Sequence, residues 1–134
     1  MLPILGIHHV AIIASDYEKS KNFYVNILGA KILTEIYRAE RQSYKLDLTF
    51  SDGNYIELFS FPSPPTRPST YEPCGLRHLA FKVQNMESAV NYLKQFHIEC
   101  EPIRIDESTQ KRFTFFRDPD NLPLELYEIN NSMG

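Results

Sequence analysis

The feature that most constrains the fold is an internal repeat that spans about half the chain. With an offset of 69 positions, the segment HVAIIASDYEKSKNFY, starting at His9, lies over HLAFKVQNMESAVNYL, starting at His78. With an offset of 68, DGNYIELF lies over DNLPLELY, so that Glu57 aligns with Glu125. Self-similarity of this kind indicates two tandem copies of one structural unit.

Both copies have the same predicted order of elements: one strand, one helix and three further strands. The helices start after the capping residues Asp16 and Asn85, whose side chains accept hydrogen bonds from the first turn. The expected strands cover residues 5–14, 31–38, 44–51 and 54–61 in the first copy and 76–84, 99–105, 112–117 and 122–128 in the second. The helices run to about residues 28 and 96. The sequence therefore predicts an α+β fold of two βαβββ modules.

A proline-rich segment separates the two copies. Residues 62–75, PSPPTRPSTYEPCG, contain five of the nine prolines, which remove backbone donors and fix φ. We expect a linker over 62–75 between a first module at 5–61 and a second at 76–129. The length of 134 residues corresponds to about one domain, so we expect residues 1–134 to form a single domain.

Four polar residues lie inside apolar strands at positions related by the repeat: His9, Glu57, His78 and Glu125. Successive side chains of a strand point to opposite faces, so each of the four lies opposite its apolar neighbours. Taken singly, such a histidine is usually a core residue, and such a glutamate is usually exposed on a half-buried strand.

The four residues together favour a metal site. Carboxylates gathered in a cleft are costly unless something neutralises them. Two imidazoles and two carboxylates suit one divalent ion: nickel, zinc, manganese, cobalt or ferrous iron.

The adjacent histidines of GIHHVAII cannot share this role if the run is a strand throughout. His9 aligns with His78. We expect His8 to share the opposite face with Val10 and Ile12, in a packing or hydrogen-bonding role.

These motifs resemble the vicinal oxygen chelate superfamily, which comprises glyoxalases, bleomycin-resistance proteins and extradiol dioxygenases. The resemblance covers residues 5–129 and rests on HHVAIIASDYEKSKNFY, YIELF, RHLAFKV and FFRDPDNLPLELYE. It implies that the two modules form an incomplete barrel around a metal site. The family's ligands come from the first and last strands of each module, and they map onto His9, Glu57, His78 and Glu125. The set is similar to that of bacterial glyoxalase I.

The resemblance also implies an activity. We expect a metal-dependent lyase or isomerase that acts on a small substrate with vicinal oxygens through a metal-stabilised enediolate-type intermediate, with Glu57 or Glu125 as both ligand and general base. The alternatives are a dioxygenase or thiol transferase on the same fold, or a non-catalytic protein that binds a small molecule such as an antibiotic. Ile13 and Phe61 replace polar residues of bacterial glyoxalase I, which argues against a glutathione substrate.

Three further residues are candidates for substrate binding: Lys45, Arg112 and Tyr127. In their expected strands, Lys45 lies on the face opposite to Leu46, and Tyr127 lies on the same face as Glu125. If Phe113 and Phe115 pack against the helix, Arg112 faces the pocket, and its charge favours an anionic substrate. The alternative is that these cations are solvated at the rim of the barrel.

Composition excludes several other classes of protein. The net charge is −3 with no basic cluster, so we expect no nucleic-acid partner. No apolar run reaches the roughly 18–20 residues that span a bilayer, and the N-terminus lacks the features of a signal peptide. We therefore expect a cytoplasmic protein with two reduced cysteines, Cys74 and Cys100. We also expect a homodimer, with the modules paired within one chain or across the dimer.

Overall fold

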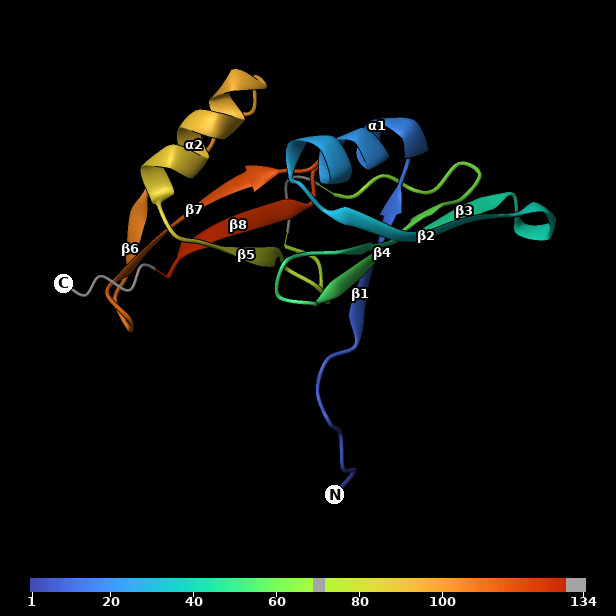
Figure 1. Cartoon of the computed structure of the whole chain (residues 1–134), viewed down its shortest axis with the longest axis horizontal. Coiled ribbons are helices and arrows are strands. Elements are labelled where there is room, and N and C mark those ends of the chain that lie inside the picture. The colour runs from blue at the N-terminus through green and yellow to red at the C-terminus, as the bar shows by residue number, and fades with distance from the viewer. Residues whose placement is uncertain (69–71, 130–134) are drawn as a thin grey trace. The chain divides into compact units, whose positions relative to one another are not determined.

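The computed structural model describes residues 1–68 and 72–129, which form two compact units, Met1–Thr66 and Arg67–Gly134. The division falls inside the proline-rich segment, of which residues 69–71 lie outside the described residues. Each unit contains one βαβββ module (Figure 1). The predicted α+β fold of two such modules is confirmed.

The first module is a mixed sheet with its helical segment on one face. Its elements are β1 (His9–Ala14), α1 (Tyr17–Lys21), the π-helix η1 (Asn22–Ile27), β2 (Lys31–Arg38), the 3₁₀ turn η2 (Ala39–Arg41), β3 (Ser43–Thr49) and β4 (Tyr55–Ser60). The strand order is β1-β4-β3-β2. β1 is parallel to β4, and the other pairs are antiparallel.

The second module repeats this topology. Its elements are β5 (Leu79–Val83), α2 (Met86–Gln95), β6 (Arg104–Asp106), β7 (Lys111–Arg117) and β8 (Pro123–Glu128). The strand order is β5-β8-β7-β6, with β5 parallel to β8. Figure 1 shows α2 lying over β7 and β8.

The two helices start where the sequence predicts. The side chain of Asp16 accepts a hydrogen bond from the backbone N–H of Lys19, and that of Asn85 accepts one from Ser88. Beyond Lys21 the first helix widens into a π-helix, which the sequence does not predict. The wider turn accompanies the burial of two successive rings, Phe23 and Tyr24. None of the described helices has the length and apolar character needed to cross a bilayer.

Three strands are several residues shorter than predicted: β1, β5 (Leu79–Val83 against the expected 76–84) and β6. β1 begins at His9, which lies opposite Tyr55, the first residue of β4. Residues 5–8 therefore have no strand beside them. In the second module, β6 is reduced to Arg104–Asp106, because Pro102 cannot donate to a ladder.

The core of each module lies between the sheet and its helix. In the first module, Ile12, Leu46 and Leu58 are buried on this side, and in the second Leu124 and Phe116 are buried. The opposite face of each sheet is more open. On these faces small residues lie beside the central glutamates, Ala11 opposite Glu57 and Ala80 opposite Glu125.

Candidate functional site

The last strand of each module presents a glutamate on the face away from the helix. In β4, Ile56 and Leu58 are buried on the helix side and Glu57 alternates with them. In β8, Leu124 and Leu126 flank Glu125 in the same way. The glutamate side chains are only 14% and 13% exposed, so both carboxylates are held close to the sheet.

A histidine on the adjacent parallel strand accompanies the first glutamate. Nε2 of His9 lies 3.5 Å from Oε2 of Glu57. The pair is formed across β1 and β4, where Ala11 is the direct neighbour of Glu57 and His9 is two residues earlier on the same face. The side chain of His9 is 37% exposed, so water reaches part of the imidazole.

The second module contains the equivalent pair. Nε2 of His78 lies 3.2 Å from Oε1 of Glu125. Phe115, the cross-strand neighbour of Glu125, contacts the imidazole edge-on with ring centroids 5.1 Å apart. The Phe115 ring therefore restricts the orientation of the His78 imidazole.

The donor atoms of each pair fit two ligands of one divalent ion. Ligands about 2.1 Å from a metal lie about 3.0 Å apart at an octahedral angle and about 3.4 Å apart at a tetrahedral angle. The separations in this structure are 3.2 and 3.5 Å. Within residues 1–68 and 72–129, no single group of three or more histidine, cysteine, aspartate or glutamate side chains could hold a metal ion. Each module thus supplies one His–Glu pair with suitable chemistry.

The residue before each histidine contacts its other ring nitrogen. Nδ1 of His8 lies 2.9 Å from Nδ1 of His9, and Nη1 of Arg77 lies 3.3 Å from Nδ1 of His78. Partners at Nδ1 orient a metal-binding imidazole and select its tautomer. His8 can accept the proton of His9 Nδ1, which leaves Nε2 free as a ligand. Arg77 can only donate, so its contact with Nδ1 of His78 puts the ring proton on Nε2 and must break before Nε2 can bind a metal.

The position of His8 corrects the sequence prediction that it lies on the helix side. Its ring contacts His9 and Tyr55, at centroid distances of 5.2 and 5.1 Å. Tyr55 shares the face of Glu57. Side chains alternate between the two faces only within a strand, and His8 precedes His9, the first residue of β1.

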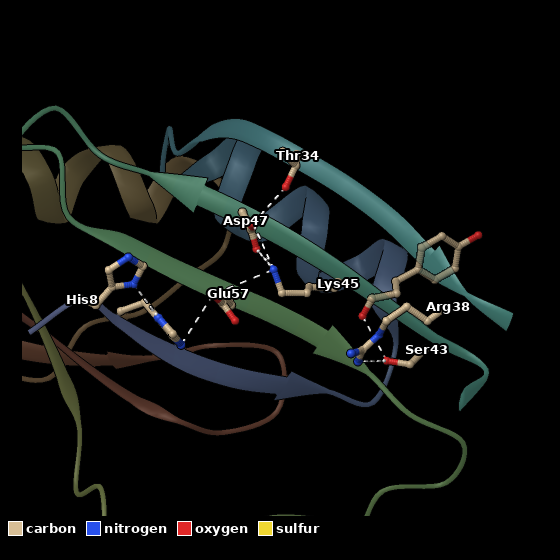
Figure 2. Close-up of polar contacts among 9 residues, drawn as sticks. His8, Thr34, Arg38, Ser43, Lys45, Asp47 and Glu57 are labelled. Atoms are coloured by element: carbon tan, nitrogen blue, oxygen red, sulfur yellow. Dashed lines mark hydrogen bonds and ion pairs between the residues drawn. The ribbon is translucent and has the colours of Figure 1, made fainter. Parts of the chain in front are cut away.

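Lys45 lies beside the first pair, on the face that its alternation with Leu46 predicts. Its Nζ is 2.7 Å from Asp47 and 3.9 Å from Glu57 (Figure 2). Burial raises the pKa of Asp47, but the hydrogen bonds from Lys45 and Thr34 outweigh it and leave that pKa below its usual value. Lys45 therefore neutralises Asp47 and helps to hold Glu57.

The structure contradicts the prediction that Arg112 faces the pocket. Phe115 is opposite Glu125, so Phe113 and Phe115 lie on the glutamate face and Arg112 lies on the helix side. Its guanidinium donates to Glu128 at 2.8 and 2.9 Å and to Glu87 of α2 at 2.5 and 2.9 Å. These hydrogen bonds lower the pKa of both carboxyl groups. Arg112 joins the helix to the sheet.

Tyr127 does share the face of Glu125. Its hydroxyl contacts Thr109 and lies 2.8 Å from Asp106. The hydrogen bond with Thr109 lowers the pKa of Tyr127, but desolvation and the bond to Asp106 together raise it above the usual value. The phenol therefore stays protonated at neutral pH.

Sequence reasoning missed Arg104, the arginine that does lie on this face. Its guanidinium stands over Phe113 at 5.0 Å from the ring centroid and is paired with Glu101 at 3.0 Å. With Phe113 and Glu125 it lines an open hollow of about 670 Å³. Finding Arg104 requires the register of β6 on β7, which places it opposite Phe113 and which the sequence alone does not give.

Comparison with known proteins identifies the family. The model of the Glyoxalase/Bleomycin resistance protein/Dioxygenase superfamily matches residues 6–126. The chain belongs to this superfamily. Among the superfamily's named enzymes are a lactoylglutathione lyase, metallothiol transferases and an epimerase, so membership is compatible with several reactions.

Similar proteins occur in several bacteria. YwkD of Bacillus subtilis is 62% identical over 92% of this chain and 96% of its own length. YaeR of Escherichia coli K12 is 57% identical over 96% of this chain and 99% of its own length. A glyoxalase family protein from Enterococcus faecalis has a solved structure that superposes with a TM-score of 0.85, at 50% identity over 92% of this chain and 98% of that one.

Proposed function

We propose that this protein is a metal-dependent lyase or isomerase that acts on a small substrate with two vicinal oxygens. The observation that carries the proposal is the recurrence of one His–Glu pair at equivalent places in both modules, with donor atoms 3.5 and 3.2 Å apart. In this proposal, His9, Glu57, His78 and Glu125 are the ligands of one divalent ion: nickel, zinc, manganese, cobalt or ferrous iron. The pairs combine within one chain or across a homodimer.

The proposed chemistry divides between the ion and the carboxylates. A divalent ion supplies Lewis acidity toward adjacent substrate oxygens. Glu57 or Glu125 takes a proton from a substrate carbon and returns it to a neighbouring atom. Each carboxylate is held by its imidazole, and Glu57 additionally by Lys45, which favours a fixed geometry for proton transfer.

Two other residues complete the proposed site. Lys45 and Tyr127 lie on the glutamate faces of their modules and are the proposed polar contacts for the substrate. Arg112 has no part in the site, because its donors are directed to Glu87 and Glu128 on the helix side.

Metal content tests the ligand assignment. Protein purified without chelators is expected to contain a divalent ion by elemental analysis, and Glu57→Gln and Glu125→Gln are expected to weaken metal affinity by about tenfold or more. Glu18→Gln is the matched control, because Glu18 lies in the first turn of α1, on the helix side of its module. Equal metal content in all variants contradicts the assignment.

A substrate screen tests the reaction. The metal-loaded protein is offered 2-hydroxycarbonyl compounds and hemithioacetals, and turnover is expected to disappear in Glu125→Gln. Oxygen consumption with ferrous iron and a catechol indicates a dioxygenase instead, and loss of an epoxide with consumption of thiol indicates a transferase. Absence of bound metal, with no change of melting temperature on adding metal ions, indicates a binding protein.

A further inference from the structure

Beyond Glu57, the same face of the first module carries two stacked aromatic rings covered by arginines. Phe59 is two residues after Glu57 on β4 and therefore shares its face. The rings of Phe59 and Phe61 are stacked, with centroids 5.9 Å apart and planes inclined by 10°. The guanidinium of Arg38 lies 5.2 Å from the centroid of Phe59, and that of Arg41 lies 5.4 Å from the centroid of Phe61.

These two arginines form a local excess of positive charge. None of the ion pairs found within the described part of the chain involves Arg38 or Arg41. Lys45 is opposite Phe59, but its charge is matched by Asp47 at 2.7 Å. Arg38 and Arg41 therefore remain available to a ligand on this face.

Arg38 also has a donor without an acceptor. Its Nε is buried and has no hydrogen-bond partner among the described residues. Its Nη2 donates to Ser43 at 3.3 Å, a long hydrogen bond (Figure 2). A buried N–H without an acceptor is costly and rare in native proteins, and a guanidinium edge matches the paired oxygens of a carboxylate or phosphate-like group.

We propose that Arg38, with Arg41 beside it, binds an anionic oxygen group at one end of the substrate. This inference rests on the proposed function, because it places the reacting oxygens near Glu57. Two residues of extended strand separate Glu57 from Phe59 by about 7 Å. The substrate is accordingly a small anion whose carboxylate, phosphonate or phosphate group lies a few bonds from its vicinal oxygens.

Titration of the metal-free full chain with methylphosphonate tests this assignment. The arginine Nε–H signals are followed by NMR, with sodium chloride as the ionic-strength control and acetate as a planar anion. The Arg38 signal is expected to shift in a saturable manner, and Arg38→Gln is expected to weaken methylphosphonate binding by about tenfold or more. Arg38→Lys keeps the charge without the paired donors and is expected to bind with intermediate affinity.

Arg117→Gln is the matched control, since Arg117 is an exposed arginine of the other module whose guanidinium already donates to the backbone carbonyl of Asn121. Its affinity for methylphosphonate is expected to equal that of the wild type. Binding that survives in Arg38→Gln, that is lost in Arg117→Gln instead, or that sodium chloride reproduces overturns the proposal. If Arg38→Gln does not fold, the signal shift in the wild type and the affinity of Arg38→Lys decide the question.

Zinc binding, measured separately by calorimetry, distinguishes this inference from the proposed function. Arg38→Gln is expected to bind zinc as the wild type does, and a parallel loss of zinc contradicts an anion-binding role. A wild type that binds methylphosphonate at Arg38 but no zinc refutes the metal site alone. A wild type that binds zinc without a shift at Arg38 refutes the anion site alone.

Discussion

Replacing Glu128, a hydrogen-bond partner of Arg112, by glutamine tests whether Arg112 has a structural role or binds substrate. Glu128 is 7% exposed, and its carboxylate accepts hydrogen bonds from Arg112 and from the backbone N–H of Met86, the first residue of α2. Glutamine has nearly the same shape and can still accept from Met86. It removes the negative charge that faces the guanidinium.

The expected cost follows from these contacts. Hydrogen bonds to charged groups contribute about 1.5–3 kcal/mol, about twice the value for neutral partners. Because water reaches part of the Arg112 side chain and offsets some of the loss, Glu128→Gln is expected to lower the free energy of unfolding by about 1–2 kcal/mol. For a chain of this size the melting temperature is then expected to fall by about 3–10 °C.

Urea unfolding followed by circular dichroism measures this loss, with Glu87→Gln as the control. Glu87 binds the same guanidinium, but its side chain is 58% exposed. Its replacement is therefore expected to cost much less. Zinc and methylphosphonate affinities are expected to stay at the wild-type values in both variants, because both carboxylates lie on the helix side.

The effect of Glu128 is expected to depend on pH. The hydrogen bonds from Arg112 are the main reason that the pKa of Glu128 is below the usual value of 4.5. The folded state therefore holds fewer protons than the unfolded state, and the stabilisation is complete above about pH 4.5 and lost as the pH falls through the folded pKa. The difference between wild type and Glu128→Gln is expected to be constant from pH 6 to 8 and to shrink below about pH 4.5.

A different result would refute the structural role. Equal unfolding free energies for wild type and Glu128→Gln, within about 0.3 kcal/mol, mean that Arg112 does not hold the helix. If ligand binding weakens at the same time, Arg112 belongs to the binding site after all.

Two other contacts give independent predictions. His8→Ala is expected to lower zinc affinity by about tenfold, because it removes the partner of His9 Nδ1, whereas the exposed His97→Ala is expected to have no effect; equal zinc affinities by calorimetry contradict the role of His8. Tyr17→Phe removes the hydrogen bond that the Tyr17 hydroxyl donates to Glu35, which helps to lower the pKa of that carboxyl. It is expected to lower the free energy of unfolding by about 1 kcal/mol and to raise the pKa of Glu35 in an NMR titration, and an unchanged pKa argues against this hydrogen bond.

The repeat and the strand alternation predict much of the fold and both His–Glu pairs. The offset that aligns His9 with His78 identifies the paired residues without any structure. Both helix caps follow from side-chain chemistry that acts over three residues, which is why the sequence locates them well.

The errors arise where a prediction needs strand register. Alternation divides β7 into two sets of residues but does not say which set faces the helix. The answer depends on the pairing of Phe115 with Glu125, a contact between strands, and the same information is needed to find Arg104 opposite Phe113. His8 is a related case, because the first residue of β1 is set by where β4 starts.

The alanines beside the two glutamates determine how much room the carboxylates have. Ala11 and Ala80 are the direct parallel neighbours of Glu57 and Glu125, and each presents a single methyl group where a longer side chain would rise alongside the carboxylate. The repeat therefore places a small residue beside the glutamate in both modules. In each module, one small residue thus leaves the side of the carboxylate open to whatever approaches that face of the sheet.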